Sequence, residues 1–455
     1  MLIETRPIDD GLAVLTVSGR LARASDLPRL LETCDALTAL GRIGQVLDLS
    51  LLKRVSFEGL ASLVELAARR PQIILCYAAL PDGPLRMLRR SGLDRGLRIL
   101  PSLEAALGTP ELRRVSLNAT RTVLFPPPVA GGGSALLLDL CGTPVIDHML
   151  AALGKYGLSD LVVDAKGEAE AIRSRLGPGS PPGMRLQFCG ARPREAERYP
   201  STGNILKNLQ EDQAAFQSDL LVCEAPIVGV PDMQAMMRAH RTSRALATAA
   251  IVSTTPPDKG DQPLGLTIYS PEAIDRLPAD SGSVTWHTPI NARTSLDQSI
   301  ATFQVPSNAI RIDSWQALFR ATAECLAGCT EVPPTGRRIG PGLWREEDAE
   351  QHRQAQIHGP CHIGAGARID AGACLKGVTA IGAGARIESA TLLQDCLVLP
   401  GAEVRQGTWA KGQVIGPNGF CDLHFANDLA VPDTLNAASP VHEDPPQPIP
   451  IRRRA

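Results

Sequence analysis

The sequence Ile-Gly-Ala-Gly-Ala-Arg-Ile occurs twice, at residues 363–369 and 381–387, and this verbatim repetition decides the fold of the C-terminal part of the chain. A repeat of six residues with one aliphatic side chain and small residues at fixed offsets is typical of a parallel β-helix, in which the aliphatic side chains stack inward and glycine permits tight corners. We predict such a β-helix over residues 355–418. Its inward positions are expected at Ile357, Ile363, Ile369, Leu375, Ile381, Ile387, Leu393 and Leu399.

The segments on either side of this repeat differ from it in composition. Residues 331–354 are rich in proline, glycine and charged side chains and have no sustained apolar period, which predicts a linker. Residues 419–455 include the proline-rich stretch Asp444–Pro450 and end in three arginines before the last alanine, so we expect a disordered tail there.

The first 108 residues alternate between strand-like and helical patterns, which predicts a small α/β domain. Strands are expected at residues 12–17, 45–49 and 73–77, and helices at 59–70 and 83–91. From Thr109 to Asn118 the apolar periodicity lapses. Residues 109–120 are therefore predicted to be a linker.

Residues 121–330 contain a second and longer alternation. Strands are expected at residues 123–125, 161–163, 185–188, 220–223 and 249–252, and helices at 143–156, 203–216 and 231–240. Strands separated in this way by helices form a mainly parallel sheet with helices on both faces. Such sheets usually bind ligands beyond the carboxyl ends of their strands. The expected fold class is thus multidomain α/β, followed by a β-helix.

Four segments of the first domain, at residues 46–50, 55–60, 92–93 and 102–107, follow one another in the order and spacing of a known family. They resemble the anti-sigma-factor antagonist domain called STAS. That family carries Asp-Ser-Ser/Thr-Gly-Leu at the start of its central helix, where a kinase phosphorylates the residue before glycine. Here the segment reads Val-Ser-Phe-Glu-Gly-Leu, with Glu58 before the glycine. The resemblance implies a protein-binding module with Ser56 and Glu58 at its switch, in which Glu58 supplies a permanent negative charge at a helix N-terminus.

Further segments, at residues 142–150, 157–163, 201–207, 265–274 and 313–326, also occur in a known order. They resemble sugar-1-phosphate nucleotidyltransferases, or sugar-nucleotide pyrophosphorylases, many of which end in a hexapeptide-repeat left-handed β-helix. The resemblance covers residues 121–330 and implies a Rossmann-like nucleotidyltransferase domain. It places Thr202 and Gly203 in the loop for the nucleobase and sugar, and Asp313 at a metal-binding aspartate.

The sequence departs from that family where charge matters most. The family's glycine-rich loop carries an arginine, whereas the matching position here offers Gly131, Gly132, Gly133 and Ser134, and no arginine or lysine occurs from Thr122 to Leu150. Backbone amides of such a loop can still cradle a phosphate. The family's Gly-Asp metal pair is replaced by Glu224-Ala225-Pro226, so Glu224 beside Asp313 is the remaining candidate pair for Mg²⁺.

The overall composition excludes several classes of function. The net charge is -2 with a pI near 6.5, so general attraction to nucleic acid or to an anionic membrane is not expected. The eleven cysteines show neither zinc-ribbon nor CxxC spacing. No leader-like segment or stretch of about 20 apolar residues is present, and we expect a cytoplasmic protein.

Three functions remain open at this point. The first is a non-catalytic or regulatory relative of the pyrophosphorylases in sugar-nucleotide or cell-surface polysaccharide synthesis, which binds a protein partner through its STAS-like domain and forms homo-oligomers through its β-helix. The second is an active Mg²⁺-dependent nucleotidyltransferase with a rearranged site that binds a nucleotide or sugar nucleotide. The third is a signalling scaffold of the anti-sigma-factor antagonist type. Acetyl transfer with His358 or His362 as base is disfavoured, because eight hexapeptides make fewer than three coils.

Overall fold

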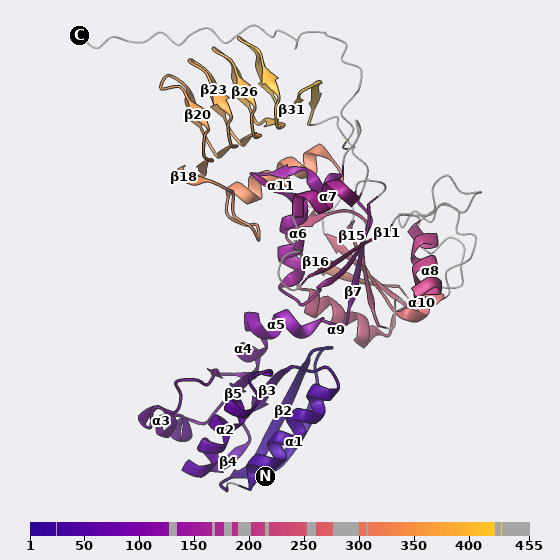
Figure 1. Cartoon of the computed structure of the whole chain (residues 1–455), viewed down its shortest axis with the longest axis vertical. Coiled ribbons are helices and arrows are strands. Elements are labelled where there is room, and N and C mark those ends of the chain that lie inside the picture. Colours follow the sequence, from indigo (N-terminus) through magenta and orange to yellow (C-terminus); the bar gives the residue numbers. More distant parts are fainter. Residues whose placement is uncertain are drawn as a thin grey trace. The chain divides into compact units, whose positions relative to one another are not determined.

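The computed structural model describes residues 1–23, 25–126, 134–165, 169–176, 184–189, 202–213, 218–252, 261–275, 300–305, 308–423 and 429. The chain divides into two compact units (Figure 1). The first consists of Met1–Pro126, Met149–Glu224 and Val230–Ala309, and the second of Pro127–His148, Ala225–Gly229 and Ile310–Ala455. The expectation of a mixed α/β protein with parallel sheets is confirmed. No helix of the described residues has the length and apolar character needed to cross a membrane.

The N-terminal sheet of the first unit has the strand order β1-β2-β3-β5-β6, with β4 paired to β2. Strand β1 is antiparallel to β2, and the remaining pairs are parallel. The strands are β1 (Leu2–Pro7), β2 (Leu12–Leu21), β3 (Gly44–Asp48), β4 (Leu52–Val55), β5 (Ile74–Ala78) and β6 (Ile99–Leu100). The helices are α1 (Asp26–Ala39), α2 (Phe57–Arg69), α3 (Asp82–Arg90), α4 (Leu103–Leu107) and α5 (Pro110–Ser116).

Both faces of this sheet are covered, as the alternation of side chains along β2 shows. Ala13, Leu15 and Val17 point to one face, where they pack in a core that includes buried leucines of α1, α2 and α3. Leu12 and Val14 point to the opposite face, which is covered by α4 and α5. Packing on both faces therefore fixes the sheet, and with it the positions at which the helices after its strands begin.

The prediction of a linker at residues 109–120 is wrong, because much of this segment is helical. It includes α5, whose Leu112 is fully buried in the second core of the N-terminal sheet. In a helix this short, Leu112 and Val115 form a single apolar pair three residues apart, which is too little for a helical period to be recognised in the sequence.

The first unit also contains a seven-stranded sheet with the order β11-β10-β7-β12-β15-β14-β16. Only β15 runs antiparallel to its neighbours among the described strands, so the expected mainly parallel sheet is confirmed. Helices α8 and α10 contribute Ile205, Leu206, Ala273 and Ile274 to the core on one face. Its strands are β7 (Arg121–Leu124), β10 (Asp160–Asp164), β11 (Arg185–Cys189), β12 (Leu220–Cys223), β14 (Ala247–Val252), β15 (Gln262–Tyr269) and β16 (Ile300–Val305). The helices near it in sequence are α6 (Val145–Gly154), α7 (Ala169–Leu176), α8 (Thr202–Gln213), α9 (Met233–Ser243) and α10 (Pro271–Asp275).

The second unit contains three sheets that the chain visits in turn (Figure 1). Their strand orders are β18-β19-β22-β25-β28-β31-β32, β20-β23-β26-β29 and β21-β24-β27-β30, and all neighbours are parallel except β18 with β19 and β31 with β32. Ile363, Ile369, Leu375, Ile381, Ile387 and Leu393 are buried between the sheets as expected, and Ile357 is half-buried. The strands are β18 (Arg337–Gly340), β19 (Leu343–Arg345), β20 (Glu350–Gln351), β21 (Gln356–His358), β22 (Cys361–Ile363), β23 (Arg368–Ile369), β24 (Cys374–Lys376), β25 (Thr379–Ile381), β26 (Arg386–Ile387), β27 (Leu392–Gln394), β28 (Leu397–Val398), β29 (Glu403–Val404), β30 (Trp409–Lys411), β31 (Gln413–Gly416) and β32 (Gly419–Asp422).

The prediction for Leu399 is wrong, because the repeat loses one residue before it. The register pairs Ile363 with Ile381, eighteen residues on, but pairs Ile381 with Val398, seventeen residues on. The missing residue lies at the corner after Leu393, where Asp395 adopts a left-handed conformation with φ of 53°. Val398 thus takes the inward position, and Leu399 is partly buried against a different cluster.

The stacked strands extend beyond the predicted bounds at both ends. The expected linker at 331–354 contains β18, β19 and β20, and the expected tail begins with β32, which pairs antiparallel with β31. The six-residue period continues into the linker, but Arg345 and Gln351 occupy its aliphatic positions, so the sequence signal is lost there. The rest of the predicted tail, apart from Leu423 and Leu429, lies outside the described residues.

One sheet of the stack is covered on its outer face by α11 (Trp315–Leu326). Trp344, Ala380, Leu397 and Val414 form the outward row of this sheet and share a core with the apolar face of α11. The short elements η1 (Ala135–Leu137), β8 (Asp139–Leu140), β9 (Thr143–Pro144), β13 (Ile227–Val228) and β17 (Ile310–Arg311) complete the described part of this unit.

Substitutions at two adjacent residues of β26 should differ strongly in their effect on the free energy of unfolding, because one side chain is buried in the stack and the other is exposed. Ile387→Asp places a carboxylate among aliphatic side chains and should lower the free energy of unfolding by at least about 3 kcal/mol, because Ile387 is fully buried. Arg386→Asp, on the exposed side of the same strand, should change it by less than about 0.5 kcal/mol. Urea unfolding of both variants measures the difference. Equal unfolding midpoints would contradict the inward assignment of Ile387.

Candidate partner-binding site

The start of α2 is held in place by its first residues. The Ser56 side chain accepts a hydrogen bond from the Gly59 amide at 3.1 Å and donates one to the Ala22 carbonyl at 2.9 Å. The Ser56 hydroxyl therefore caps the helix and fastens it to the end of β2 at the same time. A Cβ atom on Gly59 would lie 2.2 Å from the Leu21 carbonyl oxygen, so only glycine permits this approach of helix to strand.

Two large apolar side chains are exposed, one at this helix start and one in the turn before β4. Phe57 is 55% exposed although it lies between the capping serine and Glu58, and Leu51, in the turn before β4, is 56% exposed. Glu58 is exposed in the first turn of α2, where the helix dipole favours a carboxylate. Lys53 and Arg54 are exposed on β4. Aromatic side chains that a rigid scaffold holds in water are typical of protein-binding surfaces.

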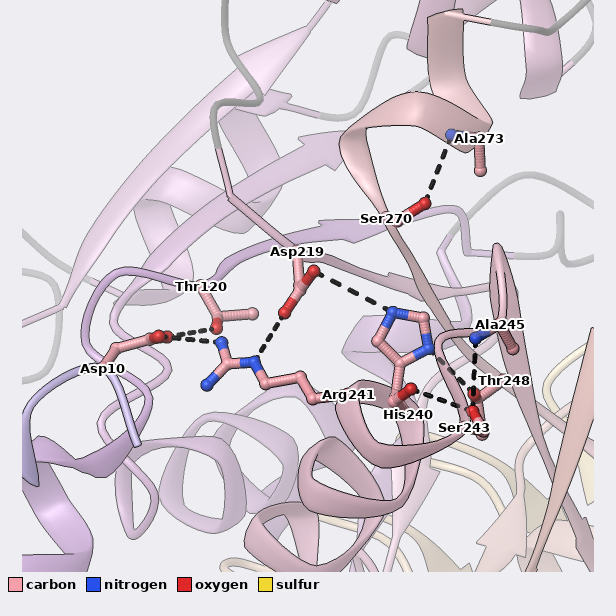
Figure 2. A network of polar contacts seen from close by, with 10 residues as sticks. All are labelled: Asp10, Thr120, Asp219, His240, Arg241, Ser243, Ala245, Thr248, Ser270 and Ala273. Carbon is pink, nitrogen blue, oxygen red and sulfur yellow. Dashed lines mark hydrogen bonds and ion pairs between the residues drawn. The ribbon is translucent and has the colours of Figure 1, made fainter. Parts of the chain in front are cut away.

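A second polar arrangement in the first unit connects the turn between β1 and β2 to α9 (Figure 2). The Arg241 guanidinium donates to Asp219 Oδ2 at 2.8 Å and to Asp10 Oδ1 at 2.7 Å. Thr120 donates its hydroxyl to the other oxygen of Asp10 at 3.1 Å. Arg241 thus joins the N-terminal sheet to the seven-stranded sheet through two charge-assisted hydrogen bonds.

His240 extends this network on the side of the seven-stranded sheet. Its Nε2 atom lies 3.9 Å from Asp219 Oδ1, and its Nδ1 atom is within 2.8 Å of the Thr248 hydroxyl (Figure 2). Burial lowers the pKa of His240, with Asp219 acting in the opposite direction. The ring is therefore neutral at pH 7 and positions Thr248 rather than adding charge.

Asp9, next to this network, is a buried carboxylate with little compensation. Its side chain is fully covered, neither of its oxygens accepts a hydrogen bond within the described residues, and the nearest cation, Arg238 Nη1, is 4.0 Å away. Burial raises the pKa of Asp9 to about 6, with Arg238 and Arg241 opposing the shift. Ionised Asp9 therefore destabilises the fold at neutral pH.

The residues predicted to bind a nucleotide are only partly described. Gly131, Gly132 and Gly133 lie outside the described residues. Ser134 is buried, and its hydroxyl accepts a hydrogen bond from the Leu136 amide as the cap of η1. Thr202 and Gly203 form the first turn of α8. Nucleotide binding by these residues stays a prediction.

The two predicted metal ligands belong to different compact units. Glu224 follows β12 in the first unit, where its amide donates to the Gly265 carbonyl at 2.8 Å. Asp313 follows β17 in the second unit and pairs with Arg311 at 2.9 Å. Within the described residues no three His, Cys, Asp or Glu side chains are grouped as a metal site would require. A shared Mg²⁺ ion therefore stays a prediction.

The histidines of the hexapeptide region differ in exposure. Four successive coils separate β19 from β31, more than the sequence count of fewer than three, so coil number is no argument against acetyl transfer. His362, however, is fully buried, with Nε2 3.2 Å from Glu346 Oε1, and burial lowers its pKa. His358 is exposed and lies within 3.3 Å of the Gln356 side chain. His362 thus has no access to a substrate in solution.

Comparison with known proteins assigns the N-terminal part of the chain. The family described as Mlab, STAS domain matches residues 5–101, about a fifth of the 455 residues. Residues 5–101 form a STAS domain. The match contains the second half of β1, strands β2 to β6 and helices α1 to α3, and with them Ser56, Glu58 and the exposed Phe57. No curated protein matches the chain.

The STAS domain makes contacts that the sequence did not reveal. Asp9 and Asp10 precede Gly11 between two strands, and such a stretch indicates a turn rather than a buried contact. The partner of Asp10, Arg241, lies 231 residues away, and no local pattern connects the two. The exposure of Phe57 was also missed, because an apolar residue at a helix start is equally compatible with the core.

The buried carboxylate of Asp9 predicts an unusual pH dependence. Because its folded pKa of about 6 exceeds the usual 3.8, the folded state binds the proton more tightly, and stability is lost as pH rises from about 4 to 7. Asp9→Asn should therefore raise the free energy of unfolding at pH 7.5 by about 1–2 kcal/mol, after discounting for solvent screening. At pH 4 the two proteins should be nearly equal.

Asp10→Asn is the matched control for this measurement. It weakens the charged hydrogen bond to Arg241, so it should destabilise the protein at pH 7.5, opposite in sign to Asp9→Asn. Urea unfolding at the two pH values measures both effects. A loss of stability in Asp9→Asn at pH 7.5 would show that the carboxylate is well compensated.

Proposed function

We propose that this chain is a non-catalytic regulatory protein that binds a protein partner through the start of α2 in its STAS domain. The observation that carries the proposal is the exposed Phe57 side chain beside Glu58, on a helix start that Ser56 and Gly59 hold rigid. A preorganised aromatic side chain loses little conformational entropy on binding, so it can act as an anchor for a partner.

Glu58 gives this proposed site a constant charge state. The STAS-like motif places a phosphorylatable residue before the glycine, and here that residue is a carboxylate. A carboxylate cannot be phosphorylated, so a kinase cannot switch this position. We infer that the partner recognises the anionic form at all times and that control is exerted elsewhere in the chain.

The remaining parts of the chain fit a degenerate sugar-nucleotide pyrophosphorylase. A mainly parallel seven-stranded sheet is compatible with a nucleotidyltransferase-like domain, and three parallel sheets built from coils of seventeen or eighteen residues are compatible with a left-handed β-helix. In this proposal the β-helix forms homo-oligomers and the protein acts in the cytoplasm, in sugar-nucleotide or cell-surface polysaccharide synthesis. These roles rest on resemblance alone.

Partner binding can be tested by site-directed crosslinking. A photoreactive phenylalanine analogue at position 57 of the full-length protein, irradiated in extract of the source cells, should form one dominant adduct. Phe57→Ala and Glu58→Ser, each carrying the same probe at position 51, should form at least fivefold less adduct than the otherwise wild-type protein with the probe at position 51, without a change in melting temperature. Each removes a contact worth about 1–2 kcal/mol.

Glu65→Ser is the control for the crosslinking experiment. Glu65 lies on the same helix, two turns beyond Glu58, and pairs with Arg69. It should leave the adduct unchanged. An equal loss of adduct in all three variants would indicate a nonspecific effect on α2 and would contradict a binding site at the helix start.

The absence of cations in one segment predicts the outcome of a catalytic assay. A triphosphate bound near residues 122–150 finds no arginine or lysine in that segment, and each lost charged hydrogen bond costs about 1.5–3 kcal/mol. We expect no pyrophosphate release from common nucleoside triphosphates with hexose 1-phosphates and Mg²⁺. Mg²⁺-dependent turnover that Asp313→Asn abolishes would establish an active enzyme instead.

A further inference from the structure

Helix α3 of the STAS domain carries an exposed group of arginines. Between residues 82 and 98 the sequence contains five arginines and two aspartates. Arg86, Arg89 and Arg90 are exposed on α3, and Arg95 is exposed in the turns that follow it. The helix is anchored by Leu88, which is fully buried in the core of the N-terminal sheet.

The spacing of these residues defines one outward face. Arg86 and Arg90 are four residues apart, and Met87 and Arg90 are three apart, so the three side chains share one side of the helix. This side is opposite the buried Leu88. Met87 is 41% exposed between the two arginines. We call Arg86, Met87 and Arg90, with the neighbouring Arg89 and Arg95, the basic face of α3.

The basic face is not explained by the stability of the domain. Within the described residues none of these four guanidinium groups has a hydrogen bond or ion pair, whereas Arg69, Arg70 and Arg98 of the same domain pair with carboxylates. The helix dipole favours Arg89 and Arg90 in the last turn but not Arg86. Two like charges four residues apart disfavour the helix. The arginines thus lack a partner inside the domain.

The position of α3 relates this face to the proposed partner site. Helices α2 and α3 contact each other, and α2 carries Phe57 at its start (Figure 1). Both helices pack on the same face of the N-terminal sheet. Phe57 and the basic face of α3 therefore belong to two contacting helices on one face of the sheet.

We propose that the basic face of α3 binds an acidic segment of the protein partner, a proposal that rests on partner binding through α2. Guanidinium groups bind carboxylates with two parallel hydrogen bonds, and exposed methionine adapts to apolar side chains of a partner. Arginine and methionine are both enriched in protein interfaces. A membrane would require a broad apolar face, of which Met87 alone is present, and the net charge of -2 opposes general attraction to nucleic acid.

A peptide probe tests this chemistry with the full-length protein. The probe is a fluorescein-labelled twenty-residue helical peptide with glutamate and leucine on one face, and its control has glutamine in place of glutamate. Wild-type protein should bind the glutamate peptide, more weakly as salt increases, and not the glutamine peptide. The double variant Arg86→Glu/Arg90→Glu should raise the Kd at least tenfold.

The matched control is Arg6→Glu/Arg29→Glu, which changes net charge equally at exposed positions on β1 and α1. It should change the Kd less than twofold. If both double variants raise the Kd equally, binding depends only on the net charge of the protein, and the proposal is wrong. A twenty-nucleotide single-stranded DNA and anionic lipid vesicles are tested in the same way. If one of them binds more tightly than the glutamate peptide and loses this binding in Arg86→Glu/Arg90→Glu, that ligand and not an acidic protein segment occupies the basic face, and the proposal is wrong.

Crosslinking from position 57 separates this inference from the proposed function. Arg86→Glu/Arg90→Glu is tested with the probe at position 57, and Phe57→Ala with the probe at position 51. If each variant reduces its adduct, both proposals are supported. If the double variant leaves the adduct intact, the basic face plays no part in partner binding and the inference is wrong, while the proposed function stands. If no adduct forms in wild-type protein, the proposed function itself fails.

Discussion

The close approach of Gly59 to the main chain of β2 is the contact on which the proposed binding site depends. Without a side chain at this position, the first turn of α2 packs directly on the end of the strand, and Ser56 caps the helix while bonding to the residue after that strand. The Phe57 side chain, two residues before Gly59, is 55% exposed. Backbone packing therefore makes rigid the helix start that carries the exposed aromatic group.

Charge is distributed in the STAS domain in two different ways. Around the turn between β1 and β2 the charged groups are paired or buried, because Asp10 is bound by Arg241 of α9 and Asp9 is buried beside them. On α3 the arginines face solvent without partners in the described residues. The pair of Asp10 and Arg241 connects the domain to the seven-stranded sheet, whereas the arginines of α3 are available to another molecule. The stability cost of Asp9 and of the two like charges of Arg86 and Arg90 on α3 is tolerated because two cores hold the sheet from both sides.

Features with a local period could be predicted from the sequence, and features set by distant contacts could not. The inward positions of the hexapeptides from Ile363 to Leu393 follow from spacing alone, and so does the helical pattern of α2. The strands before Gln351 were missed because Arg345 and Gln351 replace the aliphatic residues of the first coil, and Leu399 was misplaced by a single-residue deletion at Asp395. In the candidate site Ser56 and Glu58 were predicted, but the contact of Asp10 with Arg241 joins residues too far apart in sequence for any periodic signal.

Hydrogen–deuterium exchange of the full-length protein, with and without the partner captured at position 57, measures directly whether a partner binds at the start of α2. Binding at the start of α2 predicts slower exchange of the amides from Leu51 to Leu60, with no comparable change in the stacked strands from β22 to β31. Protection confined to those stacked strands, with unchanged exchange in α2, would contradict the account and move the binding site out of the STAS domain.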